Sequence, residues 1–192
     1  MIRKLYDWTL SLADSQHALW ALFVVAFVES SVFPIPPDVL IIPMILARPS
    51  RAWLIASVAL VGSVLGGLLG YYIGWGLFES VGRPVLEFYG KEVYFEEFRA
   101  QYNAWGAWAV LMAGVTPFPY KVITILSGST GLNLGVFMLA SVVARGLRFF
   151  VLAALLRRFG APIRRFIERY LGLLFTAFVV LLLGGFVLVK YL

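Results

Sequence analysis

The longest uncharged segment of the chain extends from Ala52 to Phe78, 27 residues without an Asp, Glu, Lys or Arg. About 20 apolar residues are enough to cross the hydrocarbon core of a bilayer as a helix. The whole chain is 61% hydrophobic and 14% charged, with a mean hydropathy of +0.90, whereas soluble domains are about 45–50% apolar and about 25% charged. A single soluble core would not bury that excess, so the segment predicts a transmembrane helix of an integral membrane protein.

Four glycines within this segment, Gly62, Gly66, Gly70 and Gly74, recur every four residues and share one helix face. Glycines at this spacing allow the backbone of another helix to approach closely. Helix–helix packing is the favoured interpretation of this glycine ridge. A surface that accommodates a lipid is the alternative.

Two proline-rich segments interrupt other apolar parts of the chain. The sequence FPIPPDVLIIP, from Phe33 to Pro43, carries four prolines and cannot lie in one continuous helix. The apolar run after it ends at Arg48, which is too early for a full span. We therefore predict a broken helical hairpin over residues 18–47 that enters and leaves the membrane on one side. The sequence TPFPYK breaks the apolar run 105–131 in the same way.

The two proline segments match each other at a separation of 83 residues, as PIPPDVLII and PFPYKVITI. Each copy is followed by a long apolar segment, at 52–78 and at 132–156. The pattern indicates an internal repeat in which each unit is a hairpin followed by a transmembrane helix. The aligned pairs are Pro34 with Pro117, Pro36 with Pro119, Asp38 with Lys121, and Val39 with Val122.

Charge is distributed unevenly along the chain. Arg48, Arg51 and the basic connector 157–169 contrast with residues 79–104, which carry five acidic and three basic residues. The positive-inside rule places the basic segments on the cytoplasmic side and residues 79–104 on the other. The two hairpins then enter from opposite sides, which makes the repeat inverted, as in many secondary transporters. This pattern accounts for the net charge of +6, so we expect no nucleic-acid partner.

All these segments form one all-α membrane domain, residues 1–192, which we expect to cross the plasma membrane several times. In a bacterium this would be the inner membrane. The domain comprises an interfacial helix (1–16), the first repeat (17–78), a surface connector (79–104), the second repeat (105–156), and a basic connector with a last apolar helix (157–192).

Five charged side chains lie within or beside the apolar segments. A charge at a helix centre costs roughly 2.5–3.5 kcal/mol to insert, so we expect all five to face protein or a wet cavity. Arg145 and Arg148 share a helix face, and Asp38 begins a helix where its carboxylate can accept bonds from backbone N–H groups. Two acids against three bases leave a surplus positive charge that an anionic phosphate head group would balance. The five residues are Glu29, Asp38, Lys121, Arg145 and Arg148.

Metal-dependent and enzymatic sites are disfavoured by the residues that the chain lacks. It has no cysteine, and its one histidine is His17, so no metal and no other cofactor is expected. An intramembrane phosphatase would use a histidine nucleophile or base, and His17 lies at the edge of the first apolar run. An aspartyl protease would need a partner for Asp38, but Asp7 and Asp14 both precede the apolar segments.

Four ordered motifs, FVESSVFPIPPDVL, GSVLGGLLGYYIG, GVTPFPYKVITILSG and ARGLRFF, resemble the DedA family of SNARE-associated or VTT-domain membrane proteins. The resemblance covers roughly residues 20 to 160 and is strongest with the small bacterial branch. It implies two oppositely oriented re-entrant hairpins, and the movement of undecaprenyl phosphate or phospholipids between leaflets in dependence on the proton-motive force. The family's acidic residues in the first hairpin correspond to Glu29 and Asp38. Many members carry two arginines around the second hairpin, where this chain has Thr116 and Lys121.

The leading hypothesis is a translocase, a flippase or scramblase, for an anionic membrane lipid. We expect the hairpin tips to bring Asp38 and Lys121 together, and Arg145 and Arg148 to hold the lipid phosphate opposite the glycine ridge. A carboxylate at membrane depth, at Glu29 or Asp38, is also a natural proton carrier. Two alternatives stay open, a secondary transporter of small anions and a structural membrane scaffold without transport activity.

Overall fold

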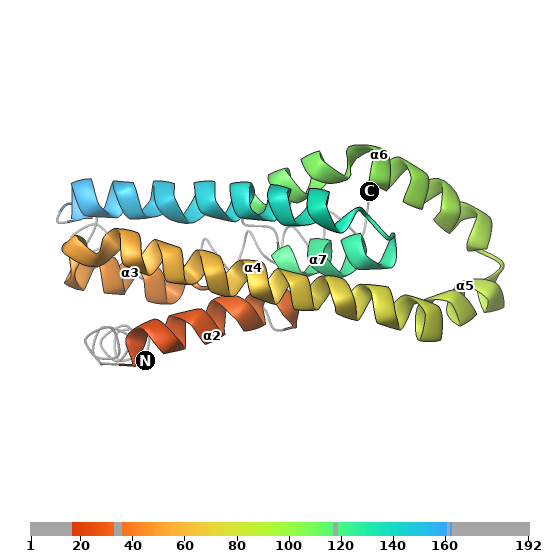
Figure 1. Ribbon diagram of the computed structural model, residues 1–192, viewed down its shortest axis with the longest axis horizontal. Helices are drawn as coiled ribbons and strands as arrows, with labels where there is room; N and C mark the ends of the chain where they lie inside the picture. Colours follow the sequence, from red (N-terminus) through yellow and green to blue (C-terminus); the bar gives the residue numbers. More distant parts are fainter. Residues whose placement is uncertain (1–16, 33–35, 117–118, 161, 163–192) are drawn as a thin grey trace.

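The computed structural model describes residues 17–32, 36–116, 119–160 and 162, which are helical almost throughout and contain no strand (Figure 1). The predicted interfacial helix 1–16, the last apolar segment, Pro34 and Pro117 lie outside these residues. The helices are α2 (Ala18–Ser31), α3 (Asp38–Ala47), η1 (Pro49–Arg51), α4 (Ala52–Leu77), the π-helix η2 (Phe78–Gly82), α5 (Arg83–Tyr89), α6 (Glu92–Val115), α7 (Tyr120–Ser129) and an unlabelled helix, Leu134–Gly160.

Both predicted transmembrane segments form long helices. The helical run Pro49–Tyr89 and the helix Leu134–Gly160 are each apolar and long enough to cross a membrane. In Figure 1 they lie along the long axis of the molecule and run in opposite directions. Their length and composition agree with the prediction of a helical membrane protein.

Separate helices flank both proline segments, as predicted. Helix α2 ends at Ser31 and α3 begins at Asp38, while α6 ends at Val115 and α7 begins at Tyr120. Proline has no N–H to donate and its ring clashes with the preceding turn, which explains why neither pair of helices is continuous. In Figure 1, α2 and α3 lie in one half of the molecule and α7 lies in the other half.

Helix α6 differs from the expected organisation. A surface connector was expected over residues 79–104, followed by a new apolar run from Trp105, but α6 runs from Glu92 to Val115 across that boundary. No proline or glycine stands between Glu92 and Trp105, so nothing in the sequence stops the helix there. The connector therefore consists of η2, α5 and the first turns of α6, whose side chains are mostly exposed.

The glycine ridge of α4 is covered by two other helices. Gly62 and Gly66 face the backbone of α2, while Gly70 and Gly74 face α7. The favoured interpretation, close helix–helix packing, is therefore confirmed. The alternative, a wall for an acyl chain, is wrong for this ridge, because the neighbouring helices already fill the space that the missing side chains leave.

Alanine in place of Gly66 or Gly74 should destabilise the protein. The added Cβ would lie 2.0 Å from the carbonyl oxygen of Phe27 at the first position and 1.9 Å from that of Ile125 at the second. Overpacking of this kind typically costs about 1–3 kcal/mol. Gly76→Ala is the matched control in the same helix, since an added Cβ there meets nothing within 4 Å. Thermal unfolding in detergent micelles measures the effect, and equal midpoints for all three variants would contradict this packing.

Candidate functional site

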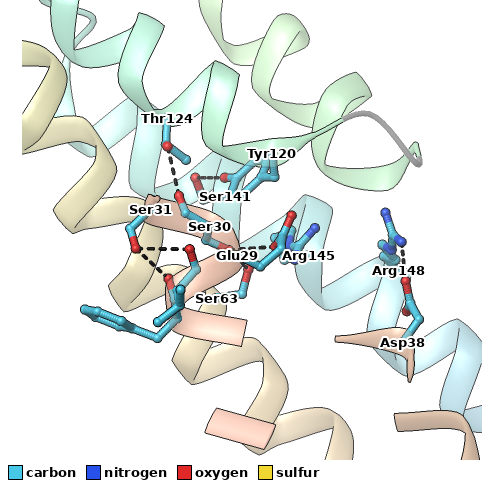
Figure 2. Close-up of polar contacts among 12 residues, drawn as sticks. Glu29, Ser30, Ser31, Asp38, Ser63, Tyr120, Thr124, Ser141, Arg145 and Arg148 are labelled. Carbon is cyan, nitrogen blue, oxygen red and sulfur yellow. Dashed lines mark hydrogen bonds and ion pairs between the residues drawn. The ribbon is translucent and has the colours of Figure 1, made fainter. Parts of the chain in front are cut away.

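The helices on either side of the two breaks contact each other through their polar groups. Thr124 Oγ1 of α7 donates a hydrogen bond to the carbonyl oxygen of Ser30 in α2, at 2.9 Å. Lys121 Nζ, also of α7, donates to the carbonyl oxygen of Val32 just after α2, at 3.1 Å. Figure 2 shows the polar side chains gathered around this meeting point. The end of α2 and the start of α7, which flank the two breaks, therefore contact each other.

Arg145 is the buried centre of this cluster. Its Nη2 donates to Glu29 Oε2 of α2 at 2.8 Å, and its Nε donates to Ser63 Oγ of α4 at 2.6 Å. The Arg145 side chain is 1% exposed, and its guanidinium carbon lies 4.8 and 4.7 Å from the ring centres of Tyr120 and Phe149. One guanidinium, carried by the helix after α7, thus connects α2, α4 and α7.

Hydroxyl groups complete the surroundings of this ion pair. Ser30 Oγ donates to Glu29 Oε2 at 3.1 Å and lies 2.7 Å from Ser63 Oγ. Tyr120 OH donates to Ser141 Oγ at 2.5 Å. These hydroxyls are not among the residues predicted from the sequence. The available signal was that each serine stands in an otherwise apolar segment, where a hydroxyl needs a hydrogen-bond partner.

Arg148 forms a second ion pair, nearer the surface. Its Nη2 donates to Asp38 Oδ2 at 2.5 Å, and its Nη1 donates to the carbonyl oxygen of Thr116, at the end of α6, at 2.7 Å. The side chains of Arg148 and Asp38 are 20% and 22% exposed. Because Arg145 and Arg148 each reach a carboxylate of the first break, their predicted common helix face is confirmed.

The surroundings of Asp38 differ from the expectation in one respect. Its carboxylate was expected to accept backbone N–H groups at the start of α3, but the N-cap residue is Pro37 and the cap has no side-chain hydrogen bond. Asp38 Oδ2 is turned to Arg148 instead, because a guanidinium is the stronger donor. Asp38 Oδ1 is buried and has no hydrogen-bond partner among the described residues.

Lys121 carries the surplus positive charge of the cluster. The expected contact between Asp38 and Lys121 is not among the ion pairs of the described residues, because Arg148 takes the carboxylate. Lys121 Nζ instead donates to the carbonyl oxygen of Val32. An ammonium group has three N–H donors, so two remain for other partners. The two acids are thus paired with the two arginines, and the excess charge lies on the lysine.

Burial separates the two ion pairs in energy. A pair as enclosed as Arg145 and Glu29 is strongly destabilised when one partner is removed, because the other is left as an uncompensated charge. The side chains of Asp38 and Arg148 are partly exposed, which weakens both their attraction and the penalty of separating them. Among the described residues no three His, Cys, Asp or Glu side chains lie close enough together to hold a metal ion.

The sequence of this region matches a known family. Residues 35–158 match the model of the VTT domain. The chain belongs to the VTT-domain (DedA) family. An uncharacterized protein of Haemophilus influenzae is 33% identical over 168 residues, which is 85% of this chain and 87% of that protein. An uncharacterized protein of Histophilus somni is 34% identical over the same shares. No solved structure matches the chain.

The VTT-domain match includes most of the cluster. Asp38, Lys121, Arg145 and Arg148 lie within residues 35–158, and Glu29 lies shortly before them. The membrane location expected from the composition agrees with this family and with the two long apolar helices. Thr116 also lies within the matched residues. The carbonyl oxygen of Thr116 accepts a hydrogen bond from Arg148, and the ammonium group of Lys121 donates one to Val32.

Substitution of Glu29 by Gln should destabilise the protein more than substitution of Asp38 by Asn. Glu29→Gln leaves Arg145 charged and enclosed, a change that typically costs about 3–5 kcal/mol, whereas Asp38 and Arg148 are partly exposed. Glu79→Gln is the control, since its ion pair with Arg83 is exposed and worth about 0–1 kcal/mol. Unfolding midpoints in micelles measure the order. If Glu29→Gln lowered the unfolding midpoint no more than Glu79→Gln does, the buried pair would not stabilise the fold.

Proposed function

We propose that this chain is a translocase that moves a lipid with an anionic phosphate head group between the two leaflets of the membrane. The observation that carries the proposal is the surplus charge of Lys121, whose ammonium group bonds the carbonyl oxygen of Val32 at the end of α2, together with the partly exposed Arg148–Asp38 pair. A cation at membrane depth that lacks a counter-ion favours binding of an anion. The resemblance to lipid-moving members of the DedA family points in the same direction.

The proposal includes an inverted repeat of two re-entrant hairpins. Helices α3 and α4 begin at Asp38 and Ala52, and their counterparts begin at Tyr120 and Leu134, in both cases 82 residues later. These separations agree to within one residue with the 83-residue repeat of the sequence. The long helices of the two units run antiparallel (Figure 1), which favours units of opposite orientation and a chain that crosses the membrane several times.

The length of α2 also supports a re-entrant hairpin. Helix α2 has 14 residues, about 21 Å at 1.5 Å per residue, whereas the hydrocarbon core is about 30 Å thick. A helix of this length reaches the interior and stops there. In transporters with broken helices, substrate sites form where such helices end, since irregular backbone is tolerated at membrane depth only next to protein or water.

Within this site Lys121 and Arg148 are the proposed phosphate ligands. Lys121 keeps two free N–H donors, and the Arg148 side chain is 20% exposed. Arg145 was expected to share this role, but its guanidinium is 1% exposed and already bonded to Glu29 and Ser63. We assign Arg145 and Glu29 to holding the first hairpin against the long helices.

Asp38 is the proposed proton carrier. Its Oδ1 has no hydrogen-bond partner among the described residues, so it is a free acceptor. A proton there would neutralise the carboxylate and release Arg148 toward a phosphate. When the phosphate leaves and Asp38 loses the proton, the ion pair of the structure re-forms. Proton binding and phosphate binding would thus be coupled through one guanidinium.

A leaflet-resolved assay in proteoliposomes tests the lipid translocase. Fluorescent short-chain phospholipid and polyprenyl phosphate should change leaflets with wild-type protein. Lys121→Gln should slow this at least about tenfold, because a hydrogen bond to a charged group is worth about 1.5–3 kcal/mol. Arg148→Lys should retain only part of the wild-type activity, since lysine keeps the positive charge but loses the two parallel N–H donors of the guanidinium.

Lys91→Gln is the matched control for Lys121→Gln, because Lys91 is exposed and lies over the ring of Tyr94, away from the breaks. Expression and thermal midpoint are compared for every variant. Uptake of radiolabelled phosphate by the same vesicles, without lipid movement, would favour a carrier of small anions. Absence of both activities in folded wild-type protein would contradict the proposal and favour a scaffold.

Asp38→Asn should remove the dependence of lipid movement on a pH gradient. In wild-type proteoliposomes the rate should change when a gradient is imposed and return when a protonophore is added. In Asp38→Asn the residue can no longer bind and release the proton, so the rate should be the same with and without the gradient. A wild-type-like response of Asp38→Asn would exclude this residue as the proton carrier.

A further inference from the structure

One end of the molecule carries exposed arginines from two helices. Helix α4 begins directly after Arg51, and the antiparallel helix Leu134–Gly160 passes Arg157 and Arg158 near its end (Figure 1). The two helix ends are packed together, since Ala52 and Leu156 belong to the same buried core cluster. The side chains of all three arginines are exposed at this end.

The positive charge at this end has no acidic counterpart in either helix. The sequence contains no Asp or Glu between residues 39 and 78, and none between residues 98 and 167. The opposite end is different. There Arg83 pairs with Glu79 and Arg99 pairs with Glu96. Arg83 and Arg99 therefore have acidic partners, whereas Arg51, Arg157 and Arg158 form no ion pair with another described residue.

An exposed indole lies beside these arginines. The Arg157 guanidinium carbon is 5.7 Å from the ring centre of Trp53, which is stacked on Phe150 with the centroids 6.0 Å apart. The Trp53 side chain is nonetheless 42% exposed. Tryptophan prefers the boundary between hydrocarbon and head groups, where its ring lies in lipid and its N–H in the polar layer. Trp53 thus marks this end as the depth of the lipid head groups.

We propose that Arg51, Trp53, Arg157 and Arg158 form a binding site for the phosphate of an anionic phospholipid in the adjacent leaflet. Guanidinium groups match phosphate geometry with two parallel hydrogen bonds. Basic clusters between helix ends on one membrane face attract anionic lipids. The aromatic platform of Trp53 and Phe150 holds the Arg157 side chain at head-group depth, with its donors available to the ligand.

This site is separate from the cluster at the helix breaks. Arg157 follows Arg148 by nine residues, about 13 Å along a helix. The ligand would be a lipid that stays bound at the surface of the protein, whether or not the lipid is also a substrate. Lipid binding here does not require translocation, and none of the four residues belongs to the proposed transport site.

Native mass spectrometry of the purified full chain in a non-ionic detergent tests the proposal. Phosphatidylglycerol should bind wild-type protein more tightly than phosphatidylcholine with the same acyl chains. Each surface arginine contributes roughly a fivefold change in the affinity for an anionic membrane lipid, so Arg157→Gln with Arg158→Gln should weaken phosphatidylglycerol binding about 30-fold. Binding of phosphatidylcholine should not change.

Arg83→Gln with Lys91→Gln is the matched control. It also removes two positive charges and one cation–aromatic contact, at the opposite end of the molecule. The control should bind phosphatidylglycerol like the wild type, and Arg157→Gln alone should lose about fivefold. Equal losses in both double variants would mean that only net charge matters and would overturn the site. Unchanged binding in Arg157→Gln with Arg158→Gln would overturn it as well.

Discussion

The buried ion pair of Arg145 and Glu29 is the interaction on which the centre of this fold depends. A guanidinium that is 1% exposed at the middle of a membrane helix requires a counter-charge and partners for its N–H groups. Glu29 supplies the charge and Ser63 accepts the Nε bond, while Tyr120 and Phe149 flank its faces. Satisfying one arginine therefore fixes α2, α4 and α7 around the helix that carries it.

Close packing along α4 makes that arrangement possible. The glycines of the ridge let the backbones of α2 and α7 approach α4 more closely than any side chain would allow. This brings Ser30 within hydrogen-bond distance of both Ser63 and Thr124. The ridge thus positions the end of α2 and helix α7 relative to α4.

The ionic cluster divides into an enclosed half and an accessible half. Arg145 and Glu29 are enclosed by hydroxyl and aromatic groups, whereas the side chains of Arg148 and Asp38 are 20% and 22% exposed. The uncompensated charge lies on Lys121, whose ammonium group donates a hydrogen bond to the backbone carbonyl of Val32. In the proposed mechanism, stability and phosphate binding belong to different members of one cluster, so variants that separate the two effects can be designed.

The sequence by itself determined the helical membrane class, the helix breaks and the set of five charged residues, because hydropathy, proline geometry and the cost of buried charge act locally. It also indicated the glycine packing. Only the tertiary structure decided which acid pairs with which base. Arg148 rather than Lys121 takes Asp38, and Arg145 is enclosed instead of facing a ligand. Ion pairing between helices depends on their relative rotation and depth, which residue spacing within one helix does not specify.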